Sequence, residues 1–173
     1  VLIRYGGDEF LLVLPGIERA AFLAKLDRIR AQLHTASVPG YSRLQLSASI
    51  GGVIMQPGET VTLCDTDGPG MVTHMWFTGY VGHSFILRIY WENNEQPSVE
   101  APFSAFFGCA YDENFSDRDG NYPVLNSAAM LVAPGRGFNS YFEMPFRKHC
   151  RITMENRGEK PETLFYMISG WYG

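Results

Sequence analysis

The feature that most constrains the fold is a period of two along the second half of the chain. In residues 71–77, Met, Thr, Met and Phe alternate with Val, His and Trp, and residues 85–91 and 150–155 alternate in the same way. Successive side chains of a β-strand point to opposite faces of a sheet, so this period indicates strands. Several such strands between Gly, Pro and Asn turns are typical of an antiparallel β-sandwich or jelly roll.

Composition divides the chain near Gln56-Pro57-Gly58, where Pro-Gly indicates a turn. Residues 1–55 hold six Lys and Arg against four Asp and Glu, whereas residues 56–173 hold eight against fourteen. Only four aromatic residues lie in the first segment. We therefore expect two units, one over residues 1–55 and one over residues 56–173.

The first segment predicts a strand, a turn, a strand, a helix and a strand. Residues 1–5 and 10–14 are short apolar runs on either side of a Gly-Gly-Asp turn. A helix is expected over residues 18–33, where apolar side chains recur at steps of three and four, and residues 44–54 form a last strand. The expected fold class is α+β and mainly β, with a partial ββαβ unit followed by the sandwich.

Charge and cysteine usage exclude several classes of protein. The net charge of −4 argues against a dedicated nucleic-acid binder, and no apolar run reaches the length of a membrane span. The first residues do not form a signal peptide, so a cytoplasmic location is expected. Three widely spaced cysteines, Cys64, Cys109 and Cys150, do not suggest a disulfide framework, and the histidines show no zinc-ligand spacing.

The four residues Gly6-Gly7-Asp8-Glu9 combine two glycines with two carboxylates at the expected strand turn. Glycine lets the backbone approach a phosphate closely, and carboxylate oxygens suit Mg²⁺ bound to substrate phosphates. This combination fits nucleotide chemistry in which the metal neutralises charge on a triphosphate. The alternative is a solvent-exposed hairpin turn.

The longer string around this turn, Arg-Tyr-Gly-Gly-Asp-Glu-Phe-Leu-Leu-Val-Leu-Pro over residues 4–15, resembles the signature hairpin of GGDEF domains. The string Leu-Ser-Ala-Ser-Ile-Gly-Gly over residues 46–52 is also similar to that family. GGDEF domains are diguanylate cyclases, which join two GTP molecules into cyclic di-GMP. The resemblance implies that Gly6 and Gly7 bind the nucleotide. It also implies that Asp8 is a Mg²⁺ ligand and catalytic carboxylate, and that Glu9 is a second acidic contributor to the metal site.

Several parts of the GGDEF pattern do not accompany this hairpin. The sequence lacks the family's earlier strand with another metal-binding Asp, and it lacks the Asn and Asp that recognise guanine. The inhibitory Arg-x-x-Asp site and the C-terminal helix pattern are also absent. We therefore expect this segment alone to be inactive as a cyclase.

The second segment resembles a different family. Its distinctive strings are Asp-Gly-Pro-Gly-Met-Val-Thr-His-Met-Trp-Phe-Thr at residues 67–78 and Pro-Gly-Arg-Gly-Phe-Asn-Ser-Tyr-Phe-Glu-Met-Pro-Phe-Arg-Lys at residues 134–148. In this order they are similar to the N-terminal part of the domain of unknown function 2961 family, grouped as glycoside hydrolase family 172. That resemblance, over residues 58–173, implies action on fructofuranosides or arabinofuranosides. It also implies a double jelly roll that assembles into trimers.

Four residues of this segment are candidates for carbohydrate contact: His74, Trp76, Arg136 and Glu143. An aromatic plane stacks on a sugar, and Arg and Glu bind its hydroxyls. The alternative is ordinary sheet packing for His74 and Trp76, and a simple turn for Arg136.

Glycoside hydrolysis needs two carboxylates, which the sequence does not pair. The resemblance places the family's catalytic glutamates beyond Gly173. The remaining candidates in this segment are Asp65, Asp67, Glu92, Glu100, Glu143 and Glu155.

Three functional hypotheses follow. The first is a chimeric or fragmentary chain whose larger part is a furanoside-acting module with an incomplete site. The second is a remnant of a GTP or cyclic di-GMP signalling domain, with Mg²⁺ as its only expected cofactor. The third is a non-catalytic β-sandwich that associates with itself. Neither nucleic acid nor membrane is an expected partner.

Overall fold

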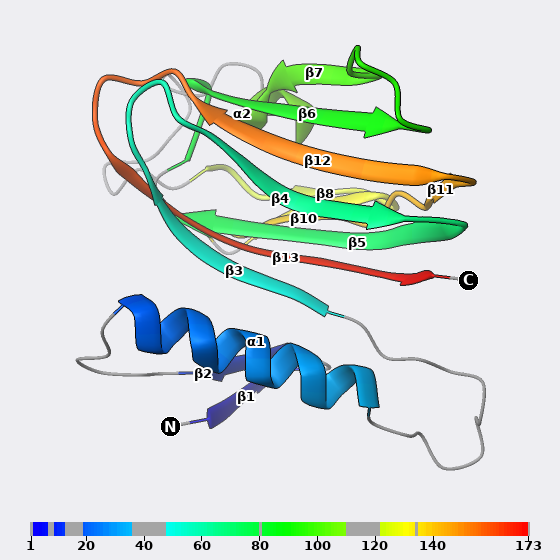
Figure 1. Cartoon of the computed structure of the whole chain (residues 1–173). Helices are drawn as coiled ribbons and strands as arrows, with labels where there is room; N and C mark the ends of the chain where they lie inside the picture. Colours follow the sequence, from blue (N-terminus) through cyan, green and yellow to red (C-terminus); the bar gives the residue numbers. More distant parts are fainter. Residues whose placement is uncertain are drawn as a thin grey trace.

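The main body of the protein is a β-sandwich of two antiparallel sheets, seen edge-on in Figure 1. The protein is described here by a computed structural model. The residues that the structure describes are 2–6, 9–12, 19–35, 48–79, 81–109, 122–133 and 135–172. The predicted mainly β fold is confirmed, and the α component over these residues consists of one longer helix and one short helix.

The first segment contains a strand hairpin and the longer helix. Strands β1 (Leu2–Gly6) and β2 (Glu9–Leu12) pair antiparallel in a two-stranded sheet of their own. Helix α1 (Arg19–Thr35) follows, one residue later at its start and two residues later at its end than the sequence predicts. No helix in the described ranges has both the length and the apolar character needed to cross a membrane.

One face of the sandwich is a seven-stranded sheet with β5 near its middle. Its hydrogen-bonded order is β3-β13-β5-β10-β9-β8, and the short strand β11 also pairs with β5. The strands of this sheet are β3 (Ala48–Met55), β5 (Gly70–Gly79), β8 (Leu125–Asn126), β9 (Met130–Val132), β10 (Phe138–Ser140), β11 (Met144–Phe146) and β13 (Glu162–Tyr172).

The other face is a four-stranded sheet with the order β4-β12-β6-β7. A bulge interrupts the β4–β12 pairing between Ile152 and Thr153. The short helix α2 (Phe103–Phe106) directly follows β7 at the edge of this sheet. The strands are β4 (Thr60–Asp67), β6 (Phe85–Trp91), β7 (Val99–Pro102) and β12 (His149–Asn156).

Strand β3 is hydrogen-bonded to the sandwich. The sequence predicts it as the last strand of the first segment, but it pairs with β13 along its whole length, from Ala48 opposite Ser169 to Met55 opposite Glu162. This pairing buries Met55 completely and packs Val53 against the core. The turn predicted after β3 is confirmed, because the Glu59 backbone N–H donates to the Gln56 carbonyl at 3.0 Å.

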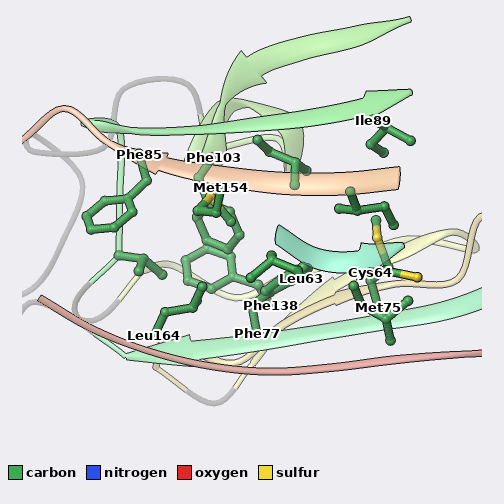
Figure 2. Close-up of a cluster of buried hydrophobic side chains, with 14 of the residues drawn as sticks. Leu63, Cys64, Met75, Phe77, Phe85, Ile89, Phe103, Phe138, Met154 and Leu164 are labelled. Carbon is green, nitrogen blue, oxygen red and sulfur yellow. The ribbon is translucent and has the colours of Figure 1, made fainter. Parts of the chain in front are cut away.

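The core lies between the two sheets and is rich in aromatic side chains (Figure 2). Phe77 from β5 and Phe138 from β10 meet Phe103 of α2 and the neighbouring Phe107, and all four are completely buried. Phe103 contacts Phe138 edge to face with ring centroids 4.8 Å apart, and Phe77 contacts Phe103 edge to face at 5.3 Å. Edge-to-face pairs align the positive ring edge with the negative ring face, so this cluster fixes how α2 sits on the sheets.

Candidate functional site

The outer faces of the two sheets differ in chemistry. On the four-stranded sheet, Arg88 bonds to both Glu100 and Glu155 at 2.7 Å, and the Arg151 guanidinium lies 4.2 Å from the ring centre of Tyr90. This face is covered by paired charges. The seven-stranded sheet has large apolar side chains on its outer face, and Ile54 and Phe165 are 60% and 46% exposed there. An exposed apolar and aromatic surface is the more informative feature, because soluble proteins usually keep such patches small.

An aromatic and polar cluster occupies the outer face of the seven-stranded sheet around β5. His74 and Trp76 share this face because Met75 and Phe77, which alternate with them, are completely buried in the core. His74 and Trp76 therefore lie on the same side of one strand, as the alternation in residues 71–77 predicts.

Tyr141 lies on His74. The two rings are parallel, with an interplanar angle of 2° and centroids 4.6 Å apart. Tyr141 still exposes 45% of its surface. The His74 ring also contacts Asn139, whose Oδ1 lies 3.1 Å from Nε2. Asn139 is buried and donates its side-chain N–H to the Leu131 carbonyl at 3.3 Å, so the imidazole and the phenol above it have a fixed support.

An extra residue in the chain places Tyr141 over His74. Ser140 at the end of β10 pairs with Met75, and Met144 at the start of β11 pairs with Val72. Residues 141–143, three in number, therefore lie opposite the two residues 73–74 of β5. Such an insertion bends the strand and redirects a side chain, as a β-bulge does.

Arg136 and Glu143 occupy different surroundings from His74 and Trp76. Arg136 lies in the turn between β9 and β10, donates to the Gly79 carbonyl at 3.2 Å and places its guanidinium 5.6 Å from the ring centre of Tyr122. These contacts favour the structural role that the sequence left open for Arg136. Glu143 is exposed in the connection that also carries Tyr141, and it directly precedes β11.

Most of the other candidate carboxylates are engaged in holding the fold. Glu92 accepts hydrogen bonds from the backbone N–H groups of Arg147 and Lys148, both at 2.7 Å. Asp65 lies 2.6 Å from the imidazole Nε2 of His149. Within the described ranges no three His, Cys, Asp or Glu side chains gather in a way that suits a metal ion.

The electrostatics of Glu155 are unsuited to general acid catalysis. A hydrogen bond from Arg157 and another from Arg88 hold the pKa of this carboxyl below its ordinary value. A glycosidase acid needs the opposite shift, so that it remains protonated near neutral pH.

The structure describes only part of the predicted nucleotide site. Gly6 ends β1 and Glu9 begins β2, and the two residues are paired in the hairpin. Gly7 and Asp8 lie outside the described residues. The hairpin expected from the sequence is confirmed, whereas the roles of Gly6, Gly7, Asp8 and Glu9 stay predictions.

Two residues of the cluster were not predicted as site residues, although both lie in the string Phe-Asn-Ser-Tyr at 138–141. Asn139 and Tyr141 become neighbours of His74 only through the β5–β10 register and the extra residue that follows it. The one feature of the sequence that could have pointed to them is that Tyr141 directly follows a short strand carrying the polar Asn139. That feature does not specify which partner strand lies beside it.

Comparison with known families gives two matches, which overlap over residues 50–65. The model of the GH172 first beta-sandwich domain matches residues 50–170, which is well over half of the chain. The model of the diguanylate cyclase GGDEF domain matches residues 1–65. No curated protein matches the chain. The chain thus joins a GGDEF segment to a two-sheet sandwich, and by the larger match it belongs to the family of the GH172 first beta-sandwich domain.

Proposed function

We propose that the β-sandwich is the carbohydrate-binding part of a furanoside-acting glycoside hydrolase. We propose that His74, Trp76 and Tyr141 form its sugar-contacting surface, with the buried Asn139 as the support of His74. The parallel stack of Tyr141 on His74 carries this proposal. A tyrosine ring that is stacked on His74 and is 45% exposed offers part of a flat apolar surface to the C–H face of a sugar. Nearby polar groups then give orientation, which is the usual composition of small-molecule sites.

Binding is proposed for this chain rather than turnover. The carboxylates with described contacts bond to arginine, histidine or backbone N–H groups. Hydrolysis would require two carboxylates facing one glycosidic bond, one of them with a raised pKa. We therefore expect the purified chain to bind furanosides weakly and to release no sugar from them.

Titration of the full chain with furanosides tests the proposal. Methyl fructofuranoside and short arabinofuranosides would be added while the indole and backbone NMR signals are followed, with methyl glucopyranoside as the comparison sugar. Tyr141→Ala should weaken binding by about tenfold, which corresponds to roughly 1.4 kcal/mol. His74→Ala should weaken it similarly, because the Tyr141 ring then loses its support.

The matched control is Tyr90→Ala. Tyr90 is also an aromatic residue on an outer sheet face, stacked by Arg151, but it belongs to the four-stranded sheet. This variant should bind the furanosides as the unmodified chain does. Absence of signal changes at any furanoside concentration, or equal loss in Tyr90→Ala and Tyr141→Ala, would overturn the proposal.

A second candidate function comes from the GGDEF segment. The β1–β2 hairpin has the predicted strand-turn-strand form, and residues 1–65 match the family model. We propose that this segment retains weak Mg²⁺-dependent GTP binding without turnover. A rise in Tm with GTP and Mg²⁺ that is absent in Asp8→Asn would support this, and an unchanged Tm would refute it.

A further inference from the structure

Two buried thiols from neighbouring strands face each other in the core. Cys64 lies on β4 and Cys150 on β12, and both belong to the buried cluster between the sheets. Cys64 points from β4 into the same core as Leu63 and Met75 (Figure 2). All three cysteines of the chain are reduced in this structure.

The strand register places the two cysteines on one diagonal of the ladder. Cys150 pairs directly with Thr66, and Cys64 pairs directly with Ile152. Diagonal neighbours on one face lie about 7–8 Å apart, and the twist of the sheet brings one of the two diagonals closer. A disulfide requires Cα atoms within about 7 Å of each other, so the bond depends on this closer approach. The adjacent bulge at Ile152 and Thr153 increases the local twist further.

The two thiols are in direct contact. A hydrogen bond with the Cys64 thiol, followed by burial, raises the pKa of Cys150 far above its ordinary value. The Cys150 thiol therefore remains protonated at neutral pH. Both thiols are buried, so neither reacts quickly with reagents while the core is closed. Strand β4 is at the edge of the four-stranded sheet, so opening of this strand gives access to both sulfur atoms.

We propose that Cys64 and Cys150 form a site of intramolecular disulfide formation that links β4 to β12. The reaction is a thiol–disulfide exchange with a low-molecular-weight disulfide such as oxidised glutathione. The thiolate of one cysteine attacks the reagent, forms a mixed disulfide and releases one glutathione thiol. The second cysteine thiolate then displaces the other glutathione, so two protein thiols are oxidised and one glutathione disulfide is reduced to two thiols.

The bond would stabilise the sandwich. It closes a long loop between positions 64 and 150, which contains β5, β6 and the whole β7–β11 region. A cross-link over a loop of this size removes much of the entropy of the unfolded chain. The oxidised chain should therefore melt roughly 10 °C higher than the reduced chain.

The experiment uses the full chain incubated with oxidised glutathione in urea below the unfolding transition. Intact mass should fall by two hydrogen atoms, and a peptide map should show one linked pair containing positions 64 and 150. Cys64→Ala and Cys150→Ala should each abolish this product while keeping an apolar core. Cys109→Ala is the matched control and should keep it, because Cys109 lies after α2 in a half-buried position with its thiol toward the Phe107 carbonyl.

The peptide map of the unmodified chain decides the matter even if a variant fails to fold. A product linked through Cys109, glutathione adducts without loss of two hydrogen atoms, or an unchanged Tm after confirmed oxidation would overturn the proposal.

Discussion

Glu92 fixes the connection between β11 and β12, and its removal gives a measurable prediction. Its two carboxylate oxygens accept the backbone N–H groups of Arg147 and Lys148, both at 2.7 Å. Its own backbone N–H donates to the His149 carbonyl at 2.8 Å. One side chain therefore ties the β6–β7 turn to the start of β12.

Replacing Glu92 with Ala is expected to lower the free energy of unfolding by about 2 kcal/mol. Each hydrogen bond to a charged group is worth about 1.5–3 kcal/mol, but Arg147 and Lys148 are exposed, so water replaces part of the loss. The backbone of Glu92 has φ of 60°, and Ala meets the same strain there, so this cost cancels between the two proteins. The remaining effect is the loss of the two bonds to the carboxylate.

Urea unfolding followed by tryptophan fluorescence measures this change, with Tm as a second readout. A loss of about 2 kcal/mol corresponds to a fall in Tm of roughly 4–8 °C for a chain of this length. Glu95→Ala is the control, because Glu95 is exposed in the same turn. If Glu92→Ala and Glu95→Ala unfold within about 0.5 kcal/mol of each other, the two backbone contacts do not hold this turn.

Two further predictions concern buried or paired polar groups. Because Arg157 and Arg88 lower the pKa of Glu155, the ionised carboxylate stabilises the native state at neutral pH, and this contribution disappears as pH falls through its folded pKa, below the ordinary value of about 4.3. Urea midpoints measured between about pH 7 and pH 3 should therefore fall more steeply for the unmodified chain than for Glu155→Gln, and parallel curves would contradict this. Ser140 is completely buried, and its hydroxyl has no hydrogen-bond partner among the described residues. Ser140→Ala should therefore leave stability unchanged or raise it by about 1 kcal/mol, and a clear loss in calorimetric Tm would show that the hydroxyl has a partner.

The strands of the sandwich were predictable because their period is a local property. Alternation in residues 71–77, 85–91 and 150–155 gives β5, β6 and β12, because burying one face of a sheet requires every second residue to be apolar. The hairpin of β1 and β2 and the turn after Met55 were also predictable, since Gly and Pro restrict which backbone conformations follow.

Pairing between strands could not be predicted in the same way. Strand β3 carries an apolar sequence that suits either the first segment or the sandwich, and only the burial of Val53 and Met55 against β13 distinguishes them. The site depends on pairing even more strongly, because Tyr141 reaches His74 through one extra residue between two short strands. Sequence spacing predicts the face of a side chain, but it does not predict which distant residue lies across from it.

The position of β3 has a practical consequence for dissecting the protein. The two family matches overlap over residues 50–65, and β3 (Ala48–Met55) crosses the start of that overlap while its ladder to β13 is continuous. Most of β3 therefore matches both family models, and its backbone hydrogen bonds join it to the sandwich. A cut at the compositional boundary after Met55 would strip the sandwich of an outer strand and expose β13 to other chains. A cut before Ala48 would keep β3 paired with β13, although this position lies inside the residues 1–65 that match the GGDEF family model.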